Sequence, residues 1–306
     1  MPATGLFRFS IDRGGTFTDV YAEVPSIHGK PGFRTIKLLS EDPANYPDAP
    51  REGIRRILAE FGIPLQDGLL DSSRIEWIRM GTTVATNALL ERKGARTALV
   101  TTKGFGDILQ IGNQDRPALF DLRIEKPDLL YEKVIEVEER LQLVKDDEEA
   151  ARQEKLGRKV IMGSTGERFA VLAAPDLKAL EPRLQTVLAQ GISSVAVVFV
   201  HAYSCPQHEE AVGELARKLG CQQISLSSEV MPAVRLVSRG DTTLVDAYLT
   251  PHIRTYLDSV RSGFAGGLPD DKLLFMQSDG GLARADNFTG SRAVLSGPAG
   301  GVIGYG

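Results

Sequence analysis

The sequence predicts an α/β protein, and two patterns support that prediction. Near the N-terminus, stretches typical of antiparallel strands at 7–12, 17–24 and 33–39 precede an amphipathic helix that ends at Gly62. Between 95 and 230, buried strands alternate with amphipathic helices, which indicates a parallel layer. Because 42% of the 306 residues are hydrophobic and 25% are charged, the chain has enough apolar residues for two domains, or for one large domain with an insertion.

The first elements follow from alternation, turn residues and helix capping. Hydrophobic and polar residues alternate over 7–12, so this strand has one buried face. Gly14-Gly15 then makes a tight turn into the second strand. Asp48 suits the N-cap of the helix, and Pro50 suits its first turn, where the missing N–H costs little.

The later elements follow from the same signals. Further strands are predicted at 75–80, 95–101, 134–143, 168–172, 194–201, 223–227 and 273–276. Further helices are predicted at 84–93, within 102–109, and at 177–188, 207–219 and 239–260, and another begins at 296. We expect Pro251 to bend or split the long helix. Residues 113–131 suggest an ordered loop or surface arm, and 145–159 a charged, solvated excursion or insertion.

The composition argues against several classes of protein. A net charge of −4 gives no basic surface for nucleic acid, and no apolar run is long enough to span a membrane. The first strand begins by residue 7 without a secretion signal before it. Cys205 and Cys221 are the only cysteines in the sequence and make no disulfide framework. We therefore expect a cytosolic protein that binds neither nucleic acid nor membrane.

The turn after the first strand is a candidate phosphate site. Asp12 lies at the tip of the strand, beside glycines whose bare N–H groups can face a ligand. Thr16 and Thr18 add hydroxyl groups, and Asp12 is suited to hold Mg²⁺ through water. The alternative is an ordinary β-hairpin in which Gly14 and Gly15 only make the turn.

Two other junctions have the same ambiguity. Thr82, Thr83 and Asn87 lie where a strand passes into a helix, and they suit either an oxyanion or carboxylate pocket or a simple helix cap. Asp279 and Gly280 follow a strand in the same way. The small residues after Ser296 indicate close packing of a helix against a neighbouring element. A more specific interpretation is a hinge between lobes.

Three further groups favour structural interpretations. The spacing of His201, Cys205 and His208 invites a metal site, but no fourth ligand is evident, so a hydrogen-bonded turn is preferred. Neither Cys205 nor Cys221 has the histidine and carboxylate that an activated nucleophile needs. The segment Arg235–Arg239 suits an anion contact, although a solvated or ion-paired face is the simpler interpretation.

Seven stretches, in order, resemble the hydantoinase A/oxoprolinase family and within it the branch of ATP-hydrolysing 5-oxoprolinases. They are Ile11–Asp19, Lys37–Pro43, Gly81–Gly94, Gly104–Leu109, Asp241–Pro251, Met276–Gly281 and Leu295–Gly301. The resemblance implies the first lobe of an actin-like (ribonuclease H-like) ATPase with an inserted α/β region. It also implies an N-terminal family domain at 7–212 and the start of a second domain at 231–306. In that lobe, strands 7–12, 17–24, 33–39, 75–80 and 272–276 share one sheet.

The resemblance further implies a reaction, which is the ATP-dependent hydrolysis of 5-oxo-L-proline to L-glutamate in the glutathione cycle. Phosphorylating the amide oxygen makes the lactam open to attack by water, and phosphoryl transfer needs positioning and charge neutralisation. By resemblance, the cofactors are ATP and Mg²⁺ and the catalytic residues are Asp12, Thr16 and Asp19. Nucleotide binding then involves Asp12, Arg13, Gly14, Gly15, Thr16 and Thr18, and substrate binding involves Thr82, Thr83, Asn87, Asp279 and Gly280.

Two alternatives stay open at the level of sequence. One is an ATP-dependent hydantoinase or another cyclic-amide hydrolase, and the other is a truncated fragment that acts only as a binding module. Family members carry a second Asp-x-Gly-Gly-Thr turn after the Gly-rich helix, whereas this sequence has one. We therefore expect an N-terminal fragment whose partner is the remaining C-terminal part or a separate subunit, and a homo-oligomer in full-length form.

Overall fold

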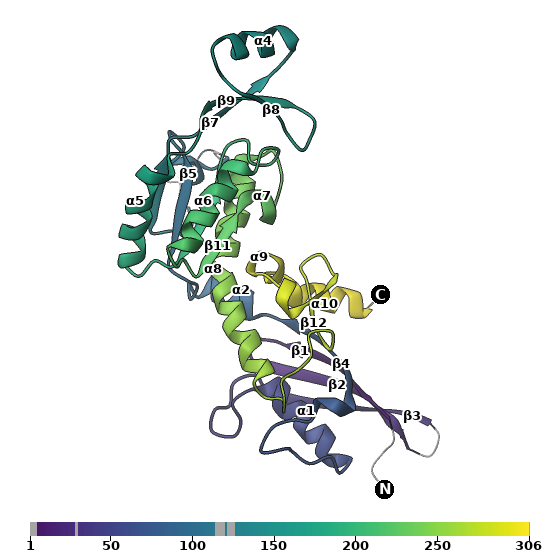
Figure 1. Cartoon of the computed structure of the whole chain (residues 1–306). Coiled ribbons are helices and arrows are strands. Elements are labelled where there is room, and N and C mark those ends of the chain that lie inside the picture. The colour runs from purple at the N-terminus through teal and green to yellow at the C-terminus, as the bar shows by residue number, and fades with distance from the viewer. Residues whose placement is uncertain (1–4, 28–29, 114–119, 121–125, 306) are drawn as a thin grey trace. The chain divides into compact units, whose positions relative to one another are not determined.

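In a computed structural model, which describes residues 5–27, 30–113, 120 and 126–305, the chain folds into two units (Figure 1). Unit 1 comprises Met1–Gly94 and His252–Gly306, and unit 2 comprises Ala95–Pro251. The boundaries of these units differ from those of the two family domains expected from the sequence. The difference arises because unit 2 is inserted within unit 1. Among the described residues, no helix is both long and apolar enough to cross a membrane.

Unit 1 is built on a six-stranded sheet in the order β13-β12-β4-β1-β2-β3. Its strands are β1 (Phe7–Arg13), β2 (Phe17–Ile27), β3 (Lys30–Leu39), β4 (Ile75–Thr82), β12 (Leu273–Met276) and β13 (Leu282–Arg284). β1 pairs antiparallel with β2 and parallel with β4, and β12 pairs parallel with β4. The prediction that five strands share one sheet is confirmed. The edge strand β13 was not predicted, since three residues are too few to show alternation.

Alternation in β1 separates a core face from an open face. Phe7, Phe9 and Ile11 are buried, whereas Asp12 is exposed. Helix α1 (Ala49–Glu60) covers the core face, and its backbone at Gly53 lies against Val20. The carboxylate of Asp48 accepts a hydrogen bond from the N–H of Arg51, which confirms the predicted N-cap. The open face of the sheet is therefore left to the elements that make the candidate site.

The remaining elements of unit 1 are short, apart from one long helix. α10 crosses β12, β4 and β1 (Figure 1). Its residues Gly300 and Gly301 line the same cavity as Asp12. α8 runs through Pro251 as one helix, so of the predicted bend or split the split is not found. α2 ends at Leu90, three residues before the predicted end. The elements are η1 (Ser72–Arg74), α2 (Val84–Leu90), α8 (Leu236–Arg261, shared with unit 2), η2 (Ala285–Asn287), α9 (Gly290–Ala293) and α10 (Ser296–Tyr305).

Unit 2 contains the predicted parallel layer. Its four-stranded sheet has the order β11-β10-β5-β6, and every described pairing in it is parallel. Buried side chains from the strands pack against apolar residues of the helices α5 and α6. The elements are β5 (Thr97–Thr102), α3 (Ile108–Ile111), β6 (Lys133–Val137), α5 (Leu177–Ala189), β10 (Ser194–Val198), α6 (Gln207–Lys218), β11 (Gln223–Leu226) and α7 (Ser227–Val230).

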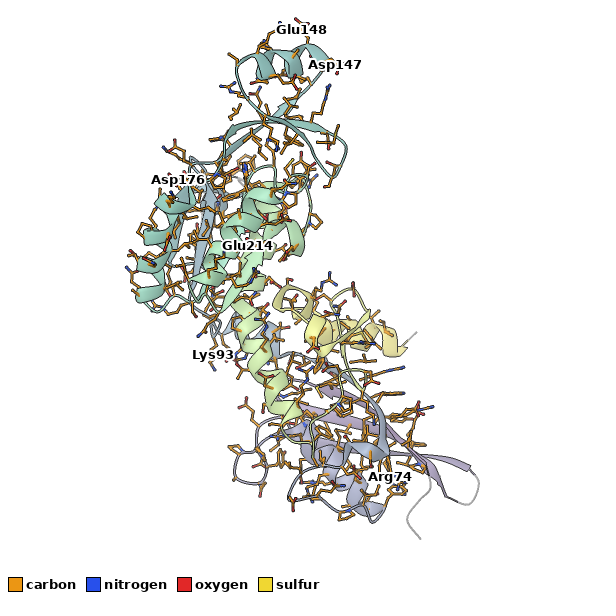
Figure 2. The ribbon with its side chains drawn as sticks, viewed as in Figure 1. Arg74, Lys93, Asp147, Glu148, Asp176 and Glu214 are labelled. Atoms are coloured by element: carbon orange, nitrogen blue, oxygen red, sulfur yellow. The ribbon has the colours of Figure 1, made fainter. Side chains whose placement is uncertain are left out.

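A small second sheet in unit 2 corrects two predictions. The single strand expected at 134–143 is two strands, β6 and β7 (Arg140–Val144), which belong to different sheets. β7 pairs with β9 (Arg168–Ala173), which also pairs with β8 (Val160–Met162). The stretch 145–159 is not only a solvated excursion, because it contains the helix α4 (Asp147–Lys155), whose residue Glu149 is buried and bonded to Gln142. Figure 2 shows the labelled Asp147 and Glu148 on α4.

The predicted helix within 102–109 and the predicted loop at 113–131 correspond only in part to described structure. The helix expected within 102–109 is the single turn Ile108–Ile111, which follows the glycines of 103–106. Much of the loop expected at 113–131 lies outside the described residues, at 114–119 and 121–125. The short helices α7 and α9 were not predicted, since four residues carry no detectable period.

Candidate functional site

A row of four residues crosses the open face of the sheet in unit 1. Asp12 on β1 is the register partner of Gly81 on β4 and of Asp19 on β2, and Asp19 is the partner of Lys37 on β3. Residues directly opposite one another across neighbouring strands point to the same face. The pairing therefore places two carboxylates and one ammonium group side by side, next to a residue without a side chain.

A cavity of about 770 Å³ lies over this row. The row forms part of its floor, and Arg79 lines it from β4. On the opposite side it is lined by Gly280 of the β12–β13 turn and by Gly300 and Ile303 of α10. The cavity belongs to unit 1 alone, and its volume is that of a typical small-molecule site.

Asp12 is the least satisfied charged group of the row. Partial desolvation in the cavity, followed by the charge of Asp19, raises the pKa of Asp12, and the ammonium of Lys37 opposes that shift. Lys37 is itself engaged, since its Nζ lies 2.9 Å from both carboxylate oxygens of Asp19. In the described part of the chain, the carboxylate of Asp12 accepts no hydrogen bond. Its oxygens are thus available to a cation or to water bound to one.

The turn at Gly14-Gly15 is tightly constrained. The N–H of Gly14 donates to the carbonyl of Phe17 at 3.0 Å, so the expectation that both glycine N–H groups face outward is wrong for Gly14. A Cβ at Gly14 would lie 2.9 Å from that carbonyl oxygen, and one at Gly15 would lie 3.1 Å from Nδ2 of Asn87. A Cβ at Gly14 would therefore clash with the backbone, whereas one at Gly15 would need the amide of Asn87 to shift by a few tenths of an ångström. Thr16 is exposed at the tip of the turn.

Arg13 and Thr18 lie on the core face and not with Asp12. They are register partners, and neither lines the cavity. The guanidinium of Arg13 lies over the ring of Tyr256, with 5.2 Å between Cζ and the ring centroid. Thr18 is fully buried, and its hydroxyl is hydrogen-bonded to Ser40. The expectation that these two side chains line the nucleotide site is thus not supported, because neighbouring residues of a strand point to opposite faces.

The junction between β4 and α2 lies beside the glycine turn. The amide of Asn87 donates to the hydroxyl of Thr83 at 3.3 Å, and Thr83 donates to the carbonyl of Arg13 at 3.4 Å. Thr82 is buried, and its hydroxyl accepts from the N–H of Val84. Of the predicted substrate residues, Thr83 and Asn87 therefore meet the turn, whereas the hydroxyl of Thr82 serves the start of α2.

The β12–β13 turn supplies one predicted residue to the cavity. Gly280 has φ +84° and lines the cavity, and a Cβ there would meet Ile303 at 2.7 Å. Asp279 is exposed and does not line the cavity. Its carboxylate accepts from the N–H of Gly281 at 2.8 Å, so it stabilises its own turn.

Sequence reasoning missed three polar residues of this region. Lys37 belongs to the row, Ser40 contacts the glycine turn, and the hydroxyl of Ser296 donates to the carbonyl of Thr82 at 2.6 Å. Two stretches already singled out by resemblance, Lys37–Pro43 and Leu295–Gly301, contain them. The family resemblance could therefore have pointed to these residues. Their contacts could not be predicted, because the register between the strands was not known.

The candidate groups of unit 2 have structural partners. His208 Nδ1 lies 2.8 Å from a carboxylate oxygen of buried Glu139, and burial lowers the pKa of His201. No cluster of three or more metal-binding side chains occurs in the described ranges. Burial raises the pKa of Cys221 to about 11, which leaves it a poor nucleophile at neutral pH. Arg239 is fully buried, and 3.8 Å separates it from Glu209.

Comparison with known families matches almost the whole chain. Residues 8–220 match the family described as "Hydantoinase/oxoprolinase N-terminal region", and residues 239–306 match "Hydantoinase/oxoprolinase". The chain is 54% identical to 5-oxoprolinase 1 of Arabidopsis thaliana, over 98% of this chain and 23% of that protein. It is 50% identical to 5-oxoprolinase of Dictyostelium discoideum, over 97% of this chain and 24% of that protein. The chain thus spans about a quarter of the length of these curated relatives.

Comparison with solved structures supports the predicted fold class. The ATP-dependent caprolactamase from Pseudomonas jessenii superposes with a TM-score of 0.67 and 25% identity, over 95% of this chain and 39% of that one. A nucleotide-free acetone carboxylase has the same TM-score at 19% identity, over 97% of this chain and 40% of that one, which shows the fold alone. The predicted class, an α/β lobe of the actin-like ATPase type with an inserted α/β region, is confirmed.

Proposed function

Since this chain belongs to the hydantoinase/oxoprolinase family, we propose that it forms the first ATP-binding lobe of an enzyme that hydrolyses 5-oxo-L-proline to L-glutamate. Relatives named 5-oxoprolinase, at 54% and 50% identity, support this choice of substrate. The observation that carries the proposal is the carboxylate of Asp12, which accepts no hydrogen bond from the described residues and lies in a large cavity beside the glycine turn.

The donor set fits a magnesium–nucleotide complex. A carboxylate oxygen is the ligand type that Mg²⁺ prefers, and one or two carboxylates with several waters are its usual protein contacts. The pKa of Asp12 is raised by partial desolvation and then by the charge of Asp19, and a bound cation would compensate both effects. When bound, Mg·ATP provides the phosphoryl group that activates the lactam oxygen. Asp12 would hold the metal through water, and Asp19, kept in place by Lys37, would add to the negative field around it.

The glycine turn and its neighbours orient the phosphate groups. Gly15 and Thr16 offer N–H groups that no described residue engages, and the hydroxyl of Thr16 is exposed beside them. Asn87 lies next to Gly15, and its amide is hydrogen-bonded to the hydroxyl of Thr83. We assign Thr83 and Asn87, together with Gly280, to contact with the lactam substrate rather than with the phosphate groups. Backbone N–H groups at fixed positions stabilise developing charge without reorganising.

The rest of the enzyme completes this site. We propose that the remaining part of the protein, as a C-terminal region or a separate subunit, supplies the second phosphate turn and the hydrolytic half. The full-length form is proposed to be a homo-oligomer. A cytosolic location in the glutathione cycle is consistent with two free cysteines, Cys205 and Cys221, which need no oxidising compartment.

A chimera tests the proposal directly. This chain replaces the matching segment of the Arabidopsis thaliana 5-oxoprolinase 1, and the release of ADP and glutamate from 5-oxoproline is measured. We expect activity in the chimera and a loss of about 10–100-fold in its Asp12→Asn variant, the range found when groups that orient a metal are removed. The control is Asp271→Asn, which changes an exposed aspartate outside the cavity and leaves turnover unchanged. Unchanged turnover in Asp12→Asn would remove Asp12 from the mechanism.

The same assay decides the substrate. Structural similarity to an ATP-dependent caprolactamase favours a second candidate function, the ATP-dependent opening of another cyclic amide. Hydantoin and caprolactam are therefore offered beside 5-oxoproline. We expect 5-oxoproline to have the highest kcat/KM, and a preference for either other lactam would replace it as the substrate.

A further inference from the structure

Ser40 lies directly behind the glycine turn of unit 1. It is the first residue after β3 and is buried. Its hydroxyl donates to the carbonyl of Gly14 at 2.7 Å, and its N–H donates to the carbonyl of Thr16 at 2.9 Å. A third contact joins its hydroxyl to that of Thr18, at 2.9 Å. The residue that directly follows β3 thus contacts the turn at two of its carbonyls.

The direction of these hydrogen bonds follows from counting protons. A serine hydroxyl has one proton, and Ser40 gives it to the carbonyl of Gly14. In the contact between the two hydroxyls, Thr18 must therefore be the donor and Ser40 the acceptor. The result is a buried chain from Thr18 to Ser40 to Gly14. In a low dielectric, hydrogen bonds in such a chain polarise and strengthen one another.

This chain fixes the direction of one N–H group. A trans peptide is planar, so its C=O and N–H point in opposite directions. Because the carbonyl of Gly14 is held toward Ser40 on the core side, the N–H of Gly15 in the same peptide unit must point the other way. Asn87 lies close to this peptide, since its Nδ2 would be 3.1 Å from a Cβ placed at Gly15.

We infer that Thr18 and Ser40 are positioning residues, which hold the peptide between Gly14 and Gly15 so that the N–H of Gly15 is presented to an anionic phosphate group. The inference rests on the proposed function for the identity of that anion. Neither side chain touches the ligand, since both are buried on the core side. Valine would fill the same buried volume as Thr18 but has no hydroxyl group. The positioning role therefore explains why a threonine stands at this buried position.

The test compares four variants of the full chain in a titration with Mg·ATP, followed by the amide resonances of Gly14 and Gly15. Thr18→Val and Ser40→Ala each break the chain, and we expect both to weaken Mg·ATP binding about tenfold, to speed amide exchange at Gly14, whose N–H donates to Phe17, and to shift the amide resonance of Gly15. Thr18→Ser keeps the hydroxyl and restores these properties. The matched control is Ser194→Ala in unit 2, which removes a buried serine hydroxyl that donates to the carbonyl of Ala247 at 2.6 Å. It leaves Mg·ATP binding and the turn resonances unchanged.

The outcomes separate this inference from the proposed function. If the unmodified chain does not bind Mg·ATP, the assignment as an ATP lobe loses its support, and amide exchange alone then decides the role of Thr18 and Ser40. Faster exchange in Thr18→Val and Ser40→Ala, with recovery in Thr18→Ser, supports positioning. Exchange that is unchanged in both variants overturns it. Equal loss of binding in Ser194→Ala also overturns it, because the effect would then be a general loss of stability.

Discussion

Replacing Asp12 by asparagine is expected to stabilise unit 1 while it removes the charge proposed to hold the metal. Partial desolvation and the opposing carboxylate of Asp19 raise the pKa of Asp12 in the folded chain. The folded state therefore binds this proton more tightly than the unfolded state, so stability falls as the pH rises from the ordinary aspartate pKa through the raised one. At neutral pH, above that window, the full penalty is present, and Asp12→Asn relieves it.

The size of this effect follows from the geometry of the row. Like charges directly opposite on neighbouring strands cost about 0.2–1 kcal/mol. Asp12 is exposed and Asp19 is paired with Lys37, so screening reduces the gain to about 0.5 kcal/mol. For a unit of this size, that corresponds to a rise of about 1–2 °C in Tm.

Thermal unfolding at about pH 7 and about pH 4 measures this change, since the raised pKa of Asp12 makes its carboxylate more protonated at the lower pH than an ordinary aspartate would be. The difference in Tm between Asp12→Asn and the wild type should become smaller at the lower pH. The control Asp19→Asn relieves the same repulsion but also loses the ion pair with Lys37, so it should give no net gain. A variant Asp12→Asn that is less stable than wild type at neutral pH, or equally favoured at both pH values, would refute the reasoning.

Two further sets of substitutions test packing through urea unfolding. Gly14→Ala places a Cβ 2.9 Å from the carbonyl oxygen of Phe17 and should cost about 1–3 kcal/mol, whereas Gly301→Ala meets nothing within 4 Å and should stabilise α10 by up to about 1 kcal/mol. Equal costs at the two glycines would contradict this assignment. Arg239→Met leaves Glu209 buried without its cation and should cost about 3–5 kcal/mol. Adding Glu209→Gln should recover the part of that loss that comes from the unpaired charge, because the bonds from Arg239 to the carbonyls of Phe199 and Val200 stay broken. No recovery at all would exclude the ion pair as a cause.

The sequence predicted most of the fold because most elements carry a local signal. Alternation revealed β1 and β2, and the cap at Asp48 placed α1. The failure at 134–143 has a physical reason. Alternation continues from β6 into β7, but the chain changes sheet near Glu139, whose side chain is turned inward to bond Thr102 and His208. Which sheet a strand joins depends on distant partners, and no local pattern reports them.

The candidate site was predicted in part for the same reason. Asp12 and the two glycines follow from one local motif, and Asn87 was found through a second motif that the fold brings beside Gly15. Lys37 and Ser40 were missed because their roles depend on the register between β2 and β3. Thr18 is a different kind of error, since its place two residues before buried Val20 already put it on the core face.

The two faces of the β1–β2 hairpin explain why adjacent residues of the motif have different roles. The strands keep one register from Arg8 opposite Glu23 to Arg13 opposite Thr18. With a period of two, Asp12 and Arg13 cannot both face the cavity unless the strand bulges, and the pairing of β1 with β2 shows a regular ladder there. A ligand over the open face therefore meets the carboxylate of Asp12 directly. Residues on the core face reach it only through the backbone of the turn, so Thr18 can control geometry without contributing charge.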